Sequence, residues 1–181
     1  MKILIIGNIA SGKTTLGMKI GEMLDIPLVE IDKIREKYLI HGRVSEEYLC
    51  LYHFLRHAES NENVILEFTG VGCHKYAVRR ALELSGHKVL VIVCRTDSPS
   101  INLQRLKSKN YSYAHPFDID INKHVFFVEK ELIRDLESGF WELKNFTVLE
   151  VPMNTPDDIE RNIEKIKAVL RAMINSSSII R

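Results

Sequence analysis

The segment from Gly7 to Thr14 has the residue types and the spacing that phosphate binding requires. It reads Gly-Asn-Ile-Ala-Ser-Gly-Lys-Thr, so two glycines are separated by four residues and followed at once by lysine and threonine. Glycines permit backbone angles that turn successive N–H groups into one concave space, where they attract an anion. The lysine ammonium can reach the terminal phosphates, and the threonine hydroxyl is placed to bind Mg²⁺. The residues expected to contact a nucleoside triphosphate are Gly7, Asn8, Ile9, Ala10, Ser11, Gly12, Lys13, Thr14 and Thr15.

The elements around this loop alternate between strand and helix patterns. Short apolar runs predict strands at 3–6, 28–31, 64–68, 89–94 and 146–151. Helical spacing of apolar residues, with glycine or proline at the ends, predicts helices at 15–24, 75–84, 98–107 and 123–137, another from 155, and a mostly helical region at 33–60. Strands that alternate with helices are typical of a three-layer α/β domain with a mainly parallel sheet.

Two carboxylates stand where such a sheet places its ligand. Ligands bind at the carboxyl ends of parallel strands, and Asp32 and Glu67 each follow or end an apolar strand. A carboxylate there can hold Mg²⁺ or accept a proton from an attacking hydroxyl group. We expect Thr14 and Glu67 to hold Mg²⁺, and Asp32 to orient or deprotonate the acceptor, with an exchange of these two carboxylate roles left open.

The composition bounds the class of protein. The 181 residues suit one domain, and 45% hydrophobic and 27% charged residues are ordinary for a globular chain. A net charge of +1 gives no general basic footprint for nucleic acid. The three cysteines lie far apart and suggest neither a disulfide framework nor a metal site. A strand pattern begins almost at the first residue and leaves no room for a signal peptide, so we expect a cytoplasmic location and no membrane partner.

Together the motifs resemble the small P-loop kinases of the nucleoside monophosphate kinase and shikimate kinase group. Asp32 and Arg35 stand as the Asp-x-x-Arg with which adenylate kinase-like enzymes begin their acceptor-binding helices, and the Glu67-Phe68-Thr69-Gly70 segment matches their acidic residue and glycine after strand three. The resemblance implies the P-loop NTPase fold, with 33–60 as the acceptor-binding region. It also implies that Arg35 binds an anionic group, so that Asp32, Arg35 and Gly70 form the substrate-binding set.

A lid is the second part that the resemblance implies. Arg105-Leu106-Lys107-Ser108-Lys109 resembles the Arg-x-x-x-Arg that opens the lid of these kinases, so 105–123 is the expected lid, and Arg105 and Lys109 are expected to contact the nucleotide. A lid excludes water, which would otherwise hydrolyse the nucleotide. The chain departs from the family at Lys109, where lysine replaces arginine, and at Glu67, where the family more often has aspartate. The arginine that adenylate kinases carry shortly after that strand is absent, and His74 and Lys75 are nearest to its place.

The sequence therefore predicts a single kinase-like domain over 1–181 that transfers a phosphoryl group from ATP, with Mg²⁺, to a small anionic or nucleotide-like acceptor. Its expected catalytic residues are Lys13, Asp32, Glu67 and Arg105. A nucleotide-hydrolysing switch is one alternative, although the guanine-reading Asn-Lys-x-Asp motif is missing. A kinase that acts on nucleic-acid ends is another, with the 41–56 region and the lid as a groove.

Overall fold

The computed structural model describes residues 1–108 and 120–175. Within these ranges the strands are β1 (Lys2–Gly7), β2 (Leu28–Glu30), β3 (Val64–Glu67), β4 (Val89–Arg95) and β5 (Phe146–Pro152). The helices are α1 (Lys13–Leu24), α2 (Ile31–Tyr38), α3 (Val44–Glu59), α4 (His74–Leu84), α5 (Pro99–Ser108), α6 (Ile121–Glu137) and α7 (Asp158–Asn175). No helix within the described ranges is long and apolar enough to cross a bilayer.

The strands form one five-stranded sheet in the order β2-β3-β1-β4-β5, and each described pair of neighbours is parallel. β1 lies at the centre, where Ile5 pairs with Glu67 of β3 on one side and with Ile92 of β4 on the other. The chain leaves β1 between these two neighbours, which is the place where parallel sheets open a crevice for a ligand. The segment after Gly7 therefore begins at the natural ligand site of the fold.

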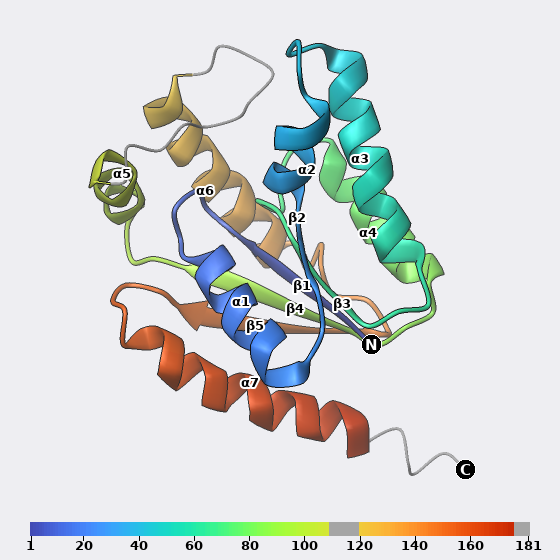
Figure 1. Ribbon diagram of the computed structural model, residues 1–181. Coiled ribbons are helices and arrows are strands. Elements are labelled where there is room, and N and C mark those ends of the chain that lie inside the picture. Colours follow the sequence, from blue (N-terminus) through green and yellow to red (C-terminus); the bar gives the residue numbers. More distant parts are fainter. Residues whose placement is uncertain (109–119, 176–181) are drawn as a thin grey trace.

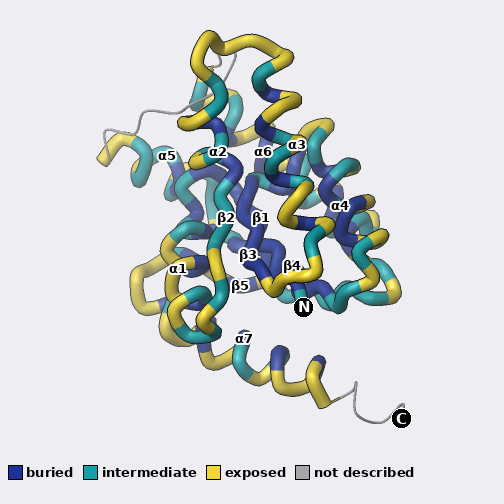
Figure 2. The backbone as a smooth tube through the Cα atoms, turned by 45° about the vertical axis from the view of Figure 1, so that its right-hand side comes forward, coloured by how far each residue is buried: buried dark blue, intermediate teal, exposed yellow. Residues whose placement is uncertain are grey.

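The residues of β1 alternate between two cores because successive side chains point to opposite faces of a strand. Leu4 and Ile6 pack with α3, α4 and α6, whereas Ile3 and Ile5 pack with α1 and α7. Figure 1 shows these two groups of helices on opposite sides of the sheet. In Figure 2 the central strands are buried along their length, while the outer side of α7 is exposed. This is the predicted three-layer α/β/α fold, with a sheet that is parallel throughout.

The second strand is shorter than the apolar run predicted. It ends at Glu30, and Ile31 already belongs to α2, so the expected strand at 28–31 is wrong at its last residue. Ile31 is buried against Phe68 and the core of α3, and a helix turn places it there as well as a strand would. Asp32 consequently lies in the first turn of α2 and not at a strand end.

Candidate active site

The loop between β1 and α1 is shaped by its two glycines. Gly12 adopts a φ of 89° directly before α1, and Ala10 between them has a φ of 55°. A Cβ atom on Gly12 would lie 2.7 Å from the Cε atom of Met153, and one on Gly7 would lie 2.6 Å from the carbonyl oxygen of Cys94. The backbone oxygen of Cys94 therefore leaves no room for a side chain at Gly7, whereas at Gly12 the left-handed backbone angle favours glycine, since the Met153 methyl group could move.

Asn8 ties this loop to α6. Its side-chain amide donates hydrogen bonds to the carbonyl oxygen of Val125 and to Oε2 of Glu129, both at 3.0 Å, and its Oδ1 accepts from the N–H of Ile9 at 2.8 Å. Glu129 also lies 3.5 Å from the Nη2 atom of Arg95 at the end of β4. Asn8 and Glu129 are both buried, so the loop shape depends on a polar contact that the core protects.

Two side chains of α5 hold the next residues of the loop. The amide of Asn102 donates to the carbonyl oxygen of Ile9 at 2.7 Å, while its Oδ1 accepts from the hydroxyl of Thr96 at 2.6 Å. Arg105 donates from Nη1 to the carbonyl oxygen of Ala10 at 3.4 Å. Three consecutive loop residues are thus held by side chains of α5 and α6, and the local motif gave no sign of these contacts.

Lys13, Thr14 and Glu67 meet at the foot of the loop. The Thr14 hydroxyl donates to Oε2 of Glu67 at 2.7 Å, and the Lys13 ammonium lies 3.8 Å from Oε1 of the same carboxylate. Lys13 also donates to the carbonyl oxygen of Asn8 at 2.9 Å. Burial raises the pKa of Glu67, although the charge of Lys13 and the hydrogen bond from Thr14 oppose that rise. The carboxylate is therefore short of compensating positive charge.

Glu30 joins this cluster, and the sequence analysis did not single it out. Its Oε2 atom lies 3.5 Å from the Thr14 hydroxyl, and burial raises its pKa, as does the charge of Asp32. Glu30 is the last residue of β2, the strand beside β3, and this position at a strand end could have identified it from the sequence. Asp32 itself lies beside the cluster and accepts from Nη1 of Arg35 at 2.9 Å.

The oxygen atoms around Thr14 suit a magnesium ion. Mg²⁺ is commonly held through one or two carboxylates and completes its shell with substrate phosphates and water. Glu67 and the Thr14 hydroxyl supply oxygen donors that touch each other. Within the described part of the chain, no group of three or more His, Cys, Asp or Glu side chains could hold a metal by itself.

Two cavities open from this point. The first has a volume of about 100 Å³ and is lined by the loop together with Asp32, Glu67 and the segment after β3. The hydroxyl of Ser11, in the same loop, is buried and has no hydrogen-bond partner among the described residues. The second cavity is larger, about 280 Å³, and shares Ile31, Phe68 and Thr69 with the first. The two cavities therefore adjoin across these three residues.

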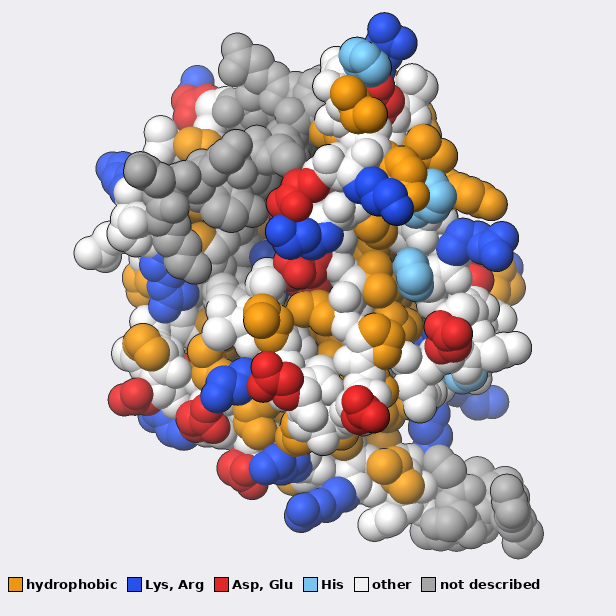
Figure 3. Space-filling model, in the orientation of Figure 1, with side chains coloured by type: hydrophobic (Ala, Val, Ile, Leu, Met, Phe, Trp, Pro, Cys, Tyr) orange, Lys and Arg blue, Asp and Glu red, His pale blue; other side chains and the backbone are white. Residues whose placement is uncertain are grey.

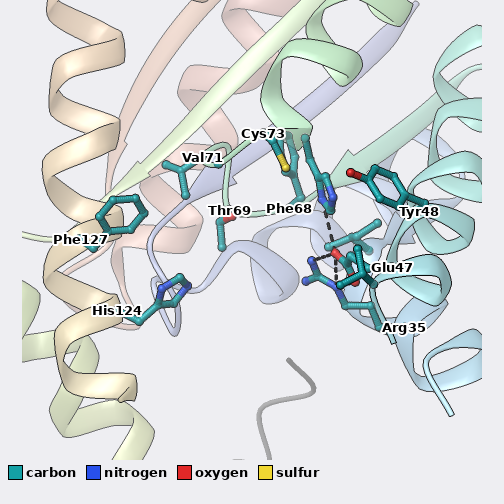
Figure 4. A pocket seen from close by; sticks show the side chains of 13 residues that line it. Arg35, Glu47, Tyr48, Phe68, Thr69, Val71, Cys73, His124 and Phe127 are labelled. Atoms are coloured by element: carbon teal, nitrogen blue, oxygen red, sulfur yellow. Dashed lines mark hydrogen bonds and ion pairs between the residues drawn. The ribbon is translucent and has the colours of Figure 1, made fainter. Parts of the chain in front are cut away.

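The second cavity lies between α3 and α6 (Figure 4). His124 and Phe127 project from α6 on one side, and Glu47 and Tyr48 project from α3 on the other. The segment between β3 and α4 forms its back. Gly70 lies in this segment with a φ of 83°, and a Cβ atom there would lie 2.7 Å from Cβ of Ile6. Gly70 thus lets the back wall pass close to the central strand.

Arg35 lines the second cavity but is held by carboxylates. Its Nε atom donates to both oxygens of Glu47, at 3.1 and 3.0 Å, and its Nη2 atom donates to Oε1. Burial disfavours the charge of Arg35, but hydrogen bonds and charge attraction from Glu47 and Asp32 outweigh it and raise the pKa. Nδ1 of His74 lies 3.4 Å from the same Glu47 oxygen. The structure thus gives Arg35 a partner that its sequence motif did not reveal.

Arg105 lies apart from Asp32 and Arg35, on the other side of the loop. Its Nη2 atom donates to the carbonyl oxygens of Met153 and Asn154, both at 2.8 Å, in the segment after β5. The sequence resemblance expected this segment to close over the base of the nucleotide. Lys109, the other predicted lid residue, lies outside the described residues.

We compared the chain with known proteins. No protein-family model matches it. The chain is similar to the adenylate kinase isoenzyme 6 homolog of Caenorhabditis elegans, with 27% identity over 174 residues that cover 91% of this chain and 86% of that protein. Shikimate kinase from Bacteroides thetaiotaomicron has a similar structure, with a TM-score of 0.65, 17% identity, and coverage of 94% of this chain and 98% of that one.

The chain has the fold of the P-loop kinases. A gluconokinase from Sinorhizobium meliloti superposes with a TM-score of 0.64 at 16% identity, covering 99% of this chain and 97% of that chain. A deoxyadenosine kinase from M. mycoides superposes with a TM-score of 0.59 at 16% identity, covering 93% and 100%. The resemblance to the adenylate kinase and shikimate kinase group is confirmed. The cavity beside the phosphate loop is the candidate place for a small-molecule ligand.

Proposed function

We propose that the chain transfers the γ-phosphoryl group of ATP, with Mg²⁺, to a hydroxyl group of a small molecule. The observation that carries the proposal is the pair of adjoining cavities. One holds Lys13, Thr14 and Glu67 beneath the phosphate loop, and the other opens beyond the shared residue Thr69. Transfer requires two substrate sites that meet at one point, whereas a hydrolysing switch requires only the first.

In this proposal the loop backbone and Lys13 bind the triphosphate, and the Lys13 ammonium offsets charge that develops on the transferred group. Thr14 and Glu67 would hold Mg²⁺, which supplies neutralisation of phosphate charge when bound. Asp32 lines the first cavity close to where the second begins, so its carboxylate orients the acceptor hydroxyl and receives its proton. Arg105 secures the nucleotide side through its hydrogen bonds to the loop and to the segment after β5.

Transfer to nucleic-acid ends finds little support on the surface. Figure 3 shows acidic and basic side chains intermingled over the described residues of this face. Phosphate backbones are bound mainly by clustered lysine and arginine, and the cavity beside the phosphate loop contains one arginine that carboxylates already engage. A small molecule is therefore the acceptor that we propose.

The test compares the wild type with Lys13→Ala in phosphoryl transfer from radiolabelled ATP to a panel of small hydroxyl compounds. Loss of the buried ammonium is expected to lower kcat by about a hundredfold or more, as for other groups that stabilise developing charge. The matched control is Lys19→Ala, since Lys19 is exposed on the same helix and its ammonium pairs with the exposed Glu160. Equal turnover by Lys13→Ala and the control would refute the mechanism. Thermal stabilisation by GTP but not by ATP would overturn the choice of donor.

A further inference from the structure

The described side chains around the second cavity provide no net positive charge. Its lining includes one guanidinium and one carboxylate, Arg35 and Glu47, which are hydrogen-bonded to each other. Asp32 adds a second carboxylate to the same arginine. The remaining polar side chains are neutral groups, among them the hydroxyls of Thr69 and Tyr48.

The two histidines of the cavity do not change this balance near neutral pH. Burial lowers the pKa of His74; the charge of Arg35 lowers it further, and the charge of Glu47 opposes the shift. Burial also lowers the pKa of His124, with a smaller contribution in the same direction from Arg35. Both rings are therefore neutral imidazoles, which can donate or accept a hydrogen bond but do not attract an anion.

An anionic acceptor would meet two obstacles in this cavity. It would compete with Glu47 and Asp32 for Arg35, whose Nε, Nη1 and Nη2 atoms each donate to a carboxylate. It would also lie next to the Glu47 carboxylate in a buried place, where like charges repel strongly. Only 11% of the Arg35 side chain and 10% of the Glu47 side chain are exposed, so water does little to screen that repulsion.

The walls of the cavity suit a flat, uncharged ring. Phe68 and Phe127 present aromatic surface from different elements, and Val71 closes the back between them (Figure 4). Aromatic and aliphatic walls with a few polar groups are typical of sites for small organic ligands. At about 280 Å³ the cavity is near the lower end of the range for such sites, about 300–1,000 Å³.

We propose that the acceptor is an uncharged alcohol that carries a flat ring, the chemistry of a nucleoside and not of a nucleoside monophosphate. This inference rests on the proposed phosphoryl transfer. The ring lies between Phe68 and Phe127, and the hydroxyl lies at Thr69, where the two cavities adjoin. The hydroxyl oxygen forms a bond to the γ-phosphorus as the bond from that phosphorus to the bridging oxygen breaks. The hydroxyl proton passes to Asp32 and then to solvent, which leaves ADP and a phosphomonoester.

The first experiment measures ADP release by the full chain with Mg²⁺ and ATP, using adenosine, guanosine, cytidine and uridine, their deoxy forms, and the 5′-monophosphate of each. We expect kcat/KM for the best nucleoside to exceed that for its monophosphate at least tenfold. A preference for the monophosphate, or transfer to neither class while ATP still binds, overturns this inference alone. Loss of Lys13-dependent ATP binding would instead overturn the proposed function.

The second experiment removes the carboxylate that engages Arg35. Glu47→Gln is expected to raise the ratio of kcat/KM for monophosphate over nucleoside about tenfold, because Arg35 then faces the cavity with one carboxylate fewer. Glu59→Gln is the matched control, since Glu59 is exposed on the same helix, and its ratio should equal that of the wild type. An unchanged ratio in a folded Glu47→Gln variant would contradict the charge argument.

A third measurement needs no variant. Cys73 is exposed and lines the cavity, whereas the other two cysteines, Cys50 and Cys94, are buried. We expect the best nucleoside to slow alkylation of Cys73 by iodoacetamide at least fivefold in the wild-type chain. Stronger protection by the monophosphate at the same concentration would overturn the inference even if Glu47→Gln failed to fold.

Discussion

Replacing Glu67 by glutamine should separate the stability of the chain from its binding of Mg²⁺. The Glu67 side chain is buried, and burial raises its pKa from the ordinary value of 4.5. A carboxyl group whose pKa is raised by folding favours the protonated form, so its charge opposes folding above that pKa. Glutamine has nearly the same shape and no charge. We therefore expect Glu67→Gln to stabilise the unliganded chain at neutral pH.

The size of this gain follows from the pKa. Each unit of elevation corresponds to about 1.4 kcal/mol of unfolding free energy at a pH above the folded pKa. The net elevation already includes the opposing hydrogen bond from Thr14 and the opposing charge of Lys13. For a chain of this size, 1 kcal/mol shifts Tm by about 2–4 °C, so a measurable rise in Tm at pH 7.5 is the expected outcome.

The stabilisation by Glu67→Gln should depend on pH. Below pH 4.5, the ordinary pKa, Glu67 is protonated in both the folded and the unfolded chain, so its ionisation contributes nothing. As the pH rises through the folded pKa, the wild type loses stability that the glutamine variant keeps. The Tm of Glu67→Gln minus that of the wild type should therefore grow between about pH 4.5 and the folded pKa and then level off.

Differential scanning fluorimetry from pH 4 to 8, with and without Mg²⁺ and ATP, measures both effects. Ligand at a hundred times its Kd adds about 2.7 kcal/mol to the wild type, and Glu67→Gln should lose most of the part that depends on Mg²⁺. The control is Glu22→Gln, an exposed position on α1. A Tm difference that shrinks as pH rises would refute the burial argument. Full stabilisation by Mg²⁺ and ATP would refute the assignment of Glu67 to the metal.

Two further predictions concern the loop support and the core. Asn102→Ala leaves the carbonyl oxygen of Ile9 without its donor, so we expect the free energy of unfolding to fall by about 1–3 kcal/mol and the KM for ATP to rise severalfold. The control is Gln104→Ala, an exposed position on the same helix, which should change neither quantity. An unaltered KM in Asn102→Ala would contradict the role of this support. Phe54→Ala removes a ring that is fully buried in α3 and should cost about 3–5 kcal/mol in urea unfolding, whereas Leu49→Ala, 43% exposed, should cost less than about 1 kcal/mol.

The fold could be predicted because its signals are local. Runs such as 89–94 are apolar throughout, as expected when helices cover both faces of a parallel strand, and β4 forms there. The end of β2 could not be fixed, since Ile31 is apolar and therefore continues the strand pattern while it serves as a buried residue of α2. Where burial alone decides between strand and helix, a sequence pattern of apolar residues does not distinguish them.

In the candidate site, too, the features that could be predicted are local in the sequence, and those that could not are contacts between distant residues. The phosphate loop was visible because its residues are consecutive, and a place for Glu67 near it was expected because Glu67 stands at the carboxyl end of a predicted parallel strand. The partner of Arg35 was not visible, because Glu47 lies on another helix, 12 residues away. The contact of Asn8 with Glu129 joins residues 121 positions apart. Without the folded chain, nothing marks one acidic residue of a helix as the one that meets a given loop.

The long separations around the phosphate loop also set the order in which the site can form during synthesis. The loop emerges near the start of the chain. However, the central strand β1 pairs with β3 and β4, so its pairing is complete only when the residues up to Arg95 have been synthesised. The donors and acceptors that hold Asn8 and Ile9 come 93 to 121 residues later in the chain. A nascent chain that stops before α6 thus contains the whole nucleotide-binding motif but cannot yet hold the loop in shape.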